Sequence, residues 1–150
     1  MNNKYMNIAV KEAKKAYFKG EIPVGSIVVC NGKIIATGSN KKEKKKCAIY
    51  HAEMIAIKKA CAKFKNWRLN DCEMYITMFP CPMCASAIKQ SRIKKIYYIV
   101  DNFNNNISNK IFCTNDLNKA VIVEKVKDDY NYKNLVENFF QKSRNRAVEK

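Results

Sequence analysis

Pro80-Cys81-Pro82-Met83-Cys84 lies where a buried apolar strand is expected to pass into a helix. Positions three apart share one face of a helix, so both thiols can bind the same metal ion. Upstream, His51-Ala52-Glu53 contains the only histidine of the chain and a carboxylate two positions later. Two thiolates and one imidazole fill three corners of a tetrahedral Zn²⁺ site and leave the fourth corner for water.

Glu53 is the expected catalytic residue, because a carboxylate beside such a site can carry a proton of the water. Residues two apart point to roughly opposite faces of a continuous helix, so His51 must lie at the mouth of its helix. The alternative is a closed structural zinc site with Cys47 or Glu53 as a fourth ligand. A ligating Glu53 would leave no proton carrier. We favour the open site, with three ligands to Zn²⁺: His51, Cys81 and Cys84.

The whole chain, 1–150, is expected to form a single domain in which strands alternate with helices. Apolar periodicity predicts helices at 5–18, 52–64, 81–90 and 133–144, and strands at 25–30, 33–37, 74–78, 93–100 and 121–126. The polar segments 39–47 and 102–109 are expected to be loops. This order is typical of an α/β fold, a three-layer α/β/α sandwich around a central mixed sheet of about five strands.

The charge balance is strongly basic. Lys and Arg number 29 against 13 Asp and Glu, a formal net charge of +16. Such an excess favours a polyanionic partner such as RNA. The alternative is a lysine- and asparagine-rich composition inherited from an AT-biased genome, with the charges merely solvated.

The cellular compartment of the protein can be inferred from its hydropathy and its cysteine content. No apolar run approaches the length of a membrane span, and the first residues lack the apolar core of a signal peptide, so we expect no membrane contact and a cytoplasmic protein. Seven cysteines cannot all pair internally. Four of them are expected to be small buried hydrophobic side chains: Cys30, Cys61, Cys72 and Cys113.

Together these residues resemble the bacterial tRNA-specific adenosine deaminases of the cytidine deaminase-like superfamily. The pattern H-x-E…P-C-x-x-C is typical of zinc-dependent nucleobase deaminases. The Pro-Val-Gly turn and Trp-Arg-Leu are more typical of the tRNA enzymes than of free-base deaminases. Matching stretches cover nearly the whole chain: 21–29, 38–40, 51–54, 67–69, 75–77, 80–85, 91–93 and 138–144.

The resemblance implies a cytidine deaminase-like fold, Zn²⁺ as cofactor, and conversion of adenosine to inosine at the wobble position of the tRNA anticodon stem-loop. It implies that Asn40 hydrogen-bonds the flipped base and that Lys142 and Arg144 contact phosphates. It also implies a homodimer, with the face around the cysteine helix as its contact. The residues implied to wall the base pocket are Val24, Pro23 and Met78.

Three departures bear on substrate choice. Phe79 stands where the family usually has an acidic residue, and segments 47–50 and 99–106 differ from the usual loops. Two alternatives therefore stay open: a deaminase of a free nucleobase, nucleoside or nucleotide (cytosine, guanine or adenine type), and a catalytically inactive zinc-containing RNA-binding module. Phe103 could stack on a base or pack internally, whereas Phe139 and Phe140 are expected to pack in the core.

Overall fold

The computed structural model describes residues 3–103, 105–114 and 119–148. Within them the chain alternates helices and strands almost as predicted. The elements are α1 (Asn3–Phe18), β1 (Gly25–Cys30), β2 (Lys33–Ser39), α2 (Lys42–Lys45), α3 (Ala52–Phe64), β3 (Cys72–Met78), α4 (Pro82–Gln90), β4 (Lys95–Val100), α5 (Asn105–Cys113), β5 (Ile122–Lys125) and α6 (Tyr132–Val148).

The five strands form one mixed sheet, as the sequence predicted, and their order in the sheet is β2-β1-β3-β4-β5. β1 pairs antiparallel with both β2 and β3, whereas β3, β4 and β5 run parallel. Parallel neighbours require crossover connections, and here α4 joins β3 to β4 while α5 joins β4 to β5.

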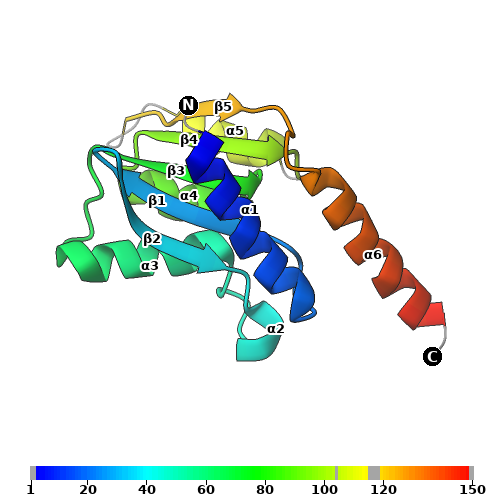
Figure 1. Ribbon diagram of the computed structural model, residues 1–150. Coiled ribbons are helices and arrows are strands. Elements are labelled where there is room, and N and C mark those ends of the chain that lie inside the picture. Colours follow the sequence, from blue (N-terminus) through cyan, green and yellow to red (C-terminus); the bar gives the residue numbers. More distant parts are fainter. Residues whose placement is uncertain (1–2, 104, 115–118, 149–150) are drawn as a thin grey trace.

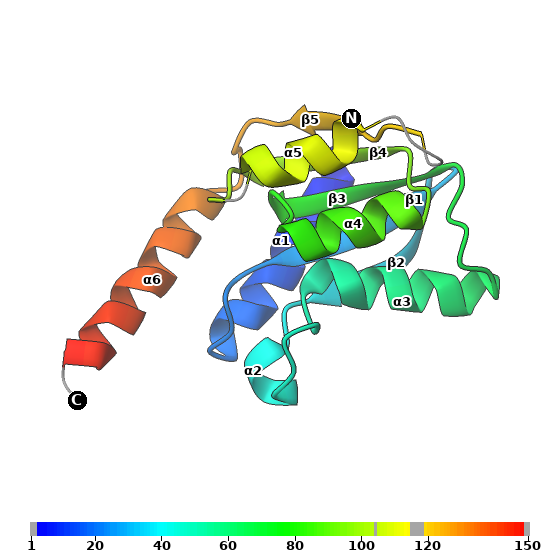
Figure 2. The ribbon, with the colours of Figure 1, turned by 180° about the vertical axis from the view of Figure 1, so that it is seen from behind.

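Helices cover both faces of the sheet, which gives the expected three layers. α1 lies across one face (Figure 1), and α3, α4 and α5 lie on the other (Figure 2). Alternate strand residues therefore enter different cores, since successive side chains point to opposite faces. Ile27 and Tyr75 pack in the core under α1, whereas Val28 and Met74 pack in the core under α3 and α4.

Two glycines let helices approach the sheet closely. A Cβ on Gly25 would lie 1.9 Å from the Ala9 carbonyl oxygen of α1, and one on Gly38 would lie 2.1 Å from the Ala52 carbonyl oxygen of α3. Neither contact is sterically possible, so only glycine fits at these points of close approach. The close approach at Gly38 thereby fixes the distance between β2 and the first turn of α3, which directly follows His51.

One edge of the sheet gathers segments that are distant in sequence. β3 ends at Met78 on this edge, and β1 begins there because it runs antiparallel to β3. Gly25 pairs with Ser39, so β2 ends at the same edge. The Gly25 N–H donates to Thr77 Oγ1 at 3.1 Å and ties the two strands there. The edge is where a sheet with parallel strands collects ligands.

Two predicted loops contain helices. Segment 39–47 includes the short helix α2, and segment 102–109 runs into α5. The asparagines of 102–109 have low helix propensity, but tertiary packing overrides it, because Phe112 and Ser108 are fully buried. Asn105, the first residue of α5, also stabilises the helix start, because its Oδ1 accepts a hydrogen bond from the Asn102 N–H at 2.6 Å.

α6 begins at Tyr132 but leaves the body of the protein, as Figure 1 shows. The expectation that Phe139 and Phe140 fill the core is wrong. Phe140 is 40% exposed, Phe139 is half-buried, and only Tyr132 and Val136 of this helix are buried. Asp128 caps the helix start, since its carboxylate accepts from the N–H groups of Tyr132 and Lys133.

Two further observations concern exposure. Cys72 is buried and Cys30 and Cys61 are half-buried, but Cys113 is exposed, contrary to expectation. Among the described residues, no helix is both long enough and apolar enough to span a bilayer.

Gly38→Ala is expected to lower the free energy of unfolding by about 2–3 kcal/mol, because the added methyl group collides with main-chain atoms of α3 that cannot swing away. Thr37→Ala, on the same strand, is the matched control and should change stability by less than about 1 kcal/mol. Urea unfolding of both variants measures the difference. Equal stabilities would mean that α3 does not need this close approach.

Candidate active site

His51 is the residue that caps the N-terminus of α3. Its backbone is extended, with φ −75° and ψ 154°, and the helix begins at the next residue. This confirms the prediction that the histidine lies at the mouth of the helix. The imidazole and the Glu53 side chain can therefore face the same space, although they are only two residues apart.

The two cysteines of the site lie at the start of α4. Cys81 occupies the N-cap position with φ −66° and ψ 168°, and Cys84 is buried one turn inside the helix. The proline in the first helical turn is Pro82, because the helix begins one residue later than the predicted start at Cys81. Proline fits there because the missing N–H would have no helical partner.

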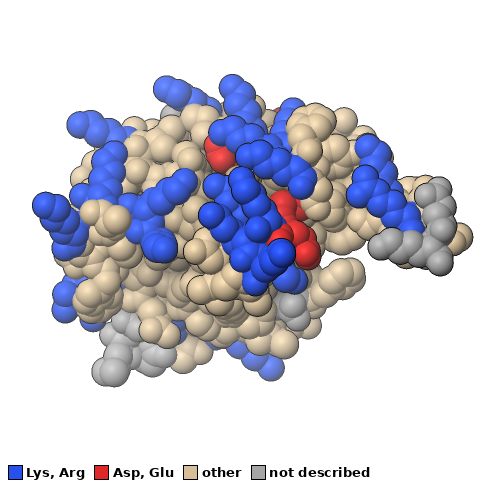
Figure 3. Space-filling model, turned by 90° about the horizontal axis from the view of Figure 1, so that it is seen from below, with Lys and Arg blue, Asp and Glu red and all other residues tan. Residues whose placement is uncertain are grey.

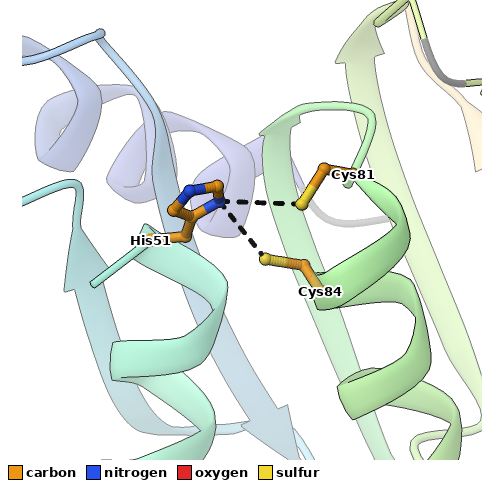
Figure 4. Close-up of side chains that lie close together, drawn as sticks. All are labelled: His51, Cys81 and Cys84. Atoms are coloured by element: carbon orange, nitrogen blue, oxygen red, sulfur yellow. Dashed lines mark hydrogen bonds between the residues drawn. The ribbon is translucent and has the colours of Figure 1, made fainter. Parts of the chain in front are cut away.

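The three donor atoms converge, as Figure 4 shows. His51 Nδ1 lies 3.7 Å from Cys81 Sγ and 3.6 Å from Cys84 Sγ, and all three atoms lie within 4.8 Å of one another. A tetrahedral ion with Zn–S of about 2.3 Å and Zn–N of about 2.0–2.1 Å separates its nitrogen and sulfur ligands by about 3.6 Å. The donor set therefore fits Zn²⁺. Cys47, the alternative ligand, is not in the group.

The cysteines are electrostatically prepared to bind a cation. Hydrogen bonds from the Cys84 thiol and from His51 lower the pKa of Cys81 to about 4, against its partial burial. The same contact with Cys81, together with burial, raises the pKa of Cys84. One thiol of the pair is thus ionised at neutral pH, which is the form that binds metal, and the N-terminus of α4 favours that charge.

Glu53 lies in the first turn of α3 and is only 4% exposed, yet it lines the cavity beside the donor atoms. Burial raises the pKa of Glu53 to about 7, although a backbone N–H and the charge of His51 act in the opposite direction. A carboxyl group with such a pKa can both accept and release a proton near neutral pH.

A cavity of about 150 Å³ opens next to these side chains. It is small, which suits one ring system rather than a stretch of polymer. Of the residues predicted to wall it, Val24 and Met78 do so, and Asn40, which was predicted to hydrogen-bond the base, also lines it. Pro23 is not among the lining residues; its carbonyl instead accepts a hydrogen bond from the Tyr132 hydroxyl at 2.6 Å.

Asn40 is buried at the mouth of this cavity, and main-chain groups hold both ends of its amide. Its Nδ2 donates to the Ile22 carbonyl at 3.2 Å, and its Oδ1 accepts from the Lys42 N–H at 3.1 Å. The side chain therefore has a fixed orientation. An amide has two N–H groups and two acceptor positions, so one of each is still available to a ligand.

Five lining residues were not predicted: Ile22, Lys42, Ala52, Phe79 and Asn102. Asn102 follows the carboxyl end of β4, so the rule that ligands collect at such strand ends could have found it. Its Nδ2 donates to the Phe79 carbonyl at 3.2 Å and braces the strand end that leads into Cys81. Lys42 could have been found from its position two residues after Asn40.

The Phe79 side chain packs into the core. It is 1% exposed, and its ring makes edge contacts with Tyr98 at 4.7 Å and with Phe112 of α5 at 6.0 Å between centroids. An acidic residue at this position would face aromatic rings. The aromatic cluster thus fixes the segment before Cys81 by packing, in addition to the hydrogen bond that the Phe79 carbonyl accepts from Asn102.

The two side chains that were predicted to contact phosphates, Lys142 and Arg144, lie on different sides of α6. Lys142 Nζ donates to the Tyr17 hydroxyl at 2.7 Å and lies over that ring. Arg144 lines a groove together with Phe103 and Phe140. Phe103 is fully exposed, so packing does not account for it.

One face of the protein is dense in Lys and Arg (Figure 3). Lys41 lies in such surroundings: partial burial lowers its pKa, and so do the neighbouring charges of Lys59 and Lys19. The repulsion among these side chains is relieved when a polyanion binds.

Comparisons with known proteins agree with this geometry. Residues 1–100 match the family described as the cytidine and deoxycytidylate deaminase zinc-binding region. A tRNA-specific adenosine deaminase of Aquifex aeolicus (strain VF5) is 36% identical over 148 residues, 96% of this chain and 97% of that protein. One of Bacillus subtilis (strain 168) is 48% identical over 94 residues, 63% of this chain and 58% of that protein. A solved structure from work on A-to-I editing by tRNA:A34 deaminases at the wobble position of transfer RNA has a TM-score of 0.76 and 30% identity, covering 83% of this chain and 98% of that chain.

Phe79→Glu is expected to destabilise the protein by about 4 kcal/mol or more, because the carboxylate would be buried among aromatic rings without a partner. Phe79→Leu keeps the site apolar and should cost only about 1–2 kcal/mol. Chemical denaturation of zinc-loaded protein compares the two. A stable Phe79→Glu variant would contradict the assignment of this side chain to the core.

Proposed function

We propose that this chain, which belongs to the tRNA-specific adenosine deaminases within the cytidine and deoxycytidylate deaminase zinc-binding family, converts adenosine to inosine at the wobble position of a tRNA anticodon. The observation that carries the proposal is the convergence of His51, Cys81 and Cys84 beside a cavity that Glu53 lines. The reaction is a hydrolysis: a C–O bond forms at C6 of adenine, the C–N bond breaks, and ammonia leaves.

His51, Cys81 and Cys84 would hold Zn²⁺, which when bound supplies Lewis-acid activation of a water molecule. The protein fixes these three donors at the ends of two helices and offers no fourth ligand from Cys47. Their number therefore favours an open catalytic site over a closed structural one.

Glu53 would move protons between water and the base. Its raised pKa lets it accept a proton from the attacking water and deliver it to the ring nitrogen and then to the departing amino group. Burial supports this role, because a carboxylate excluded from bulk solvent exchanges its proton with whatever occupies the cavity.

The cavity would take the base alone, so adenosine must leave its stack. An anticodon loop presents unpaired bases, for which extrusion costs little. Asn40 is suited to hydrogen-bond the edge of the flipped base, because its amide is already oriented by Ile22 and Lys42. Val24 and Met78 would contact the faces of the ring.

The RNA outside the cavity would lie along the basic face, with Lys142 and Arg144 contacting phosphates. The net charge of +16 and the crowded lysines around Lys41 support binding to a polyanion. A nucleic-acid substrate accounts for this charge, whereas a deaminase of free bases has no need of it.

Glu53→Gln is expected to lower kcat by about 10²–10⁴-fold, because the amide cannot carry a proton. Zinc content, measured by metal analysis, should be unchanged since Glu53 is not a ligand. Glu73→Gln, at the far end of β3, is the control and should keep full activity. Loss of zinc in the Glu53 variant would instead make this carboxylate a ligand, and an inactive wild-type protein that still bound RNA would favour the binding-module alternative.

An anticodon stem-loop with adenosine at the wobble position should be deaminated far faster than free adenosine, cytidine or guanine, as measured by ammonia release. Lys142→Ala and Arg144→Ala should raise KM for the stem-loop with little change in kcat. Each should also lower the slope of log KM against log salt concentration by about 1, since each removes one phosphate contact.

Lys33→Ala changes an exposed lysine at the hairpin remote from the cavity and should leave both KM and the salt slope unchanged. Faster deamination of a free base than of the stem-loop would overturn the tRNA assignment and favour the free-base alternative.

We further propose that the protein is cytoplasmic, where tRNA is found, and works as a homodimer through the face around α4. The outward face of this helix carries no charge in a strongly basic chain; it consists of Pro82, Met83, Ser86, Ala87 and Gln90. An uncharged surface of this kind can meet a second copy of itself without electrostatic repulsion.

Sedimentation is expected to give a dimer for the wild-type protein and a monomer for Ser86→Arg, because the new charges would face each other across a two-fold contact. Gln141→Arg, which adds the same charge on α6, should still sediment as a dimer. A wild-type monomer at all concentrations, or a dimer that tolerates Ser86→Arg, would contradict this interface.

A further inference from the structure

Cys30 on β1 and Cys72 on β3 lie opposite each other on neighbouring strands, at the end of these strands that is remote from the zinc site. They are register partners in the antiparallel pair of β1 and β3. Cys72 aims its main-chain groups away from β1, because its N–H bonds to Leu69 and its carbonyl accepts from the Lys94 N–H. The two cysteines therefore form a non-hydrogen-bonded pair, in which Cα atoms are about 4.5 Å apart.

This separation lies within the range that a disulfide spans, about 4.4–6.8 Å between Cα atoms. Both side chains also point to the same face of the sheet, since Cys72 is part of the core under α3 and α4 and Cys30 packs against that core. Both are free thiols. Burial raises the pKa of Cys72, and the neighbouring Cys30 thiol raises it further.

We propose that Cys30 and Cys72 are a modification site, which peroxide converts into a reversible disulfide between β1 and β3. Cys30 is the half-buried member and meets the oxidant first, whereas Cys72 is fully buried. Hydrogen peroxide transfers one oxygen to the Cys30 sulfur and leaves as water. The Cys72 sulfur then attacks the Cys30 sulfenic acid, an S–S bond forms, and the hydroxyl group departs as a second water molecule with the Cys72 proton.

The disulfide between Cys30 and Cys72 would close a loop that contains part of the active site. Residues 31–71 lie between the two cysteines, and they include β2, α3 and His51. A disulfide restricts the unfolded states of the segment that it closes. The bond therefore stabilises the part of the chain that presents His51 and Glu53, without touching the cavity at the other end of the strands.

The reaction is expected to be slow. Thiolates react with oxidants and disulfides, and burial followed by the contact with Cys30 raises the pKa of Cys72 to about 12, so this thiol is rarely ionised. The pair therefore suits protection during sustained exposure to peroxide and not rapid signalling. Cys81 and Cys84 are engaged by the metal in the loaded protein, so they do not compete.

The test treats zinc-loaded protein with a small molar excess of hydrogen peroxide, alkylates the remaining thiols, and maps peptides without reduction. Cleavage after Arg68 separates Cys72 from Cys61, and cleavage after Glu73 separates it from Cys81, so the partner of Cys72 is assigned unambiguously. We expect a linked peptide containing Cys30 and Cys72 that has lost two hydrogen atoms, and a Tm raised by roughly 5 °C or more that dithiothreitol reverses.

Cys30→Ser should abolish both the linked peptide and the Tm shift, and Cys30→Val provides a second variant that keeps the apolar strand. Cys61→Ser, a half-buried thiol in the same core, is the matched control and should retain both. Cys30 and Cys72 that stay fully alkylatable while exposed Cys113 is oxidised would overturn the proposal. So would a Tm shift that persists in the Cys30 variants.

Discussion

The structure depends on holding two helix N-termini against each other over one edge of the sheet. His51 precedes α3 and Cys81 precedes α4, and both residues have extended backbones that turn their side chains toward the space between the helices. Three donors separated by 3.6–3.7 Å need a rigid support, because a shift of even one helix by an ångström would spoil the tetrahedron. The sheet provides that support through the close approach at Gly38 and the bond between Gly25 and Thr77.

Elements beyond the metal ligands complete the same edge. Asn102 braces the Phe79 carbonyl, and the Phe79 ring is packed between Tyr98 and Phe112. The segment that leads into Cys81 is thus fixed from one side by a hydrogen bond and from the other by aromatic contacts. The Asn40 side chain is fixed as well, by hydrogen bonds to two main-chain groups. The deaminase site is consequently preorganised in its walls as well as in its ligands, which favours selection of a base by shape.

Much of this could be predicted from the sequence, for identifiable physical reasons. The convergence of His51, Cys81 and Cys84 could be predicted because the chain has one histidine and because residue spacing on helices is regular. The strands were found because apolar runs such as Ile27 to Val29 are continuous. α5 was missed because its asparagines disfavour helix and its stability comes from Phe112, whose partner Phe79 is distant in sequence.

Errors elsewhere have similar origins. Phe139 and Phe140 were expected in the core because hydrophobicity alone does not reveal that α6 leaves the body after Val136. The helix start was placed one residue early because Pro80 and Pro82 carry the same signal. Asn40 was identified through a resemblance, but the two main-chain bonds that orient it depend on β2 and the segment before β1 meeting at one edge. Such long-range contacts are not encoded in local periodicity.

X-ray absorption spectroscopy of the zinc-loaded protein tests the central claim most directly, because it counts ligands without regard to activity. The account predicts two sulfur atoms at about 2.3 Å, one imidazole nitrogen at about 2.0–2.1 Å, and one further light atom that exchanges with added anions. Three sulfur ligands, or a fourth protein ligand that no small anion displaces, would contradict an open catalytic position.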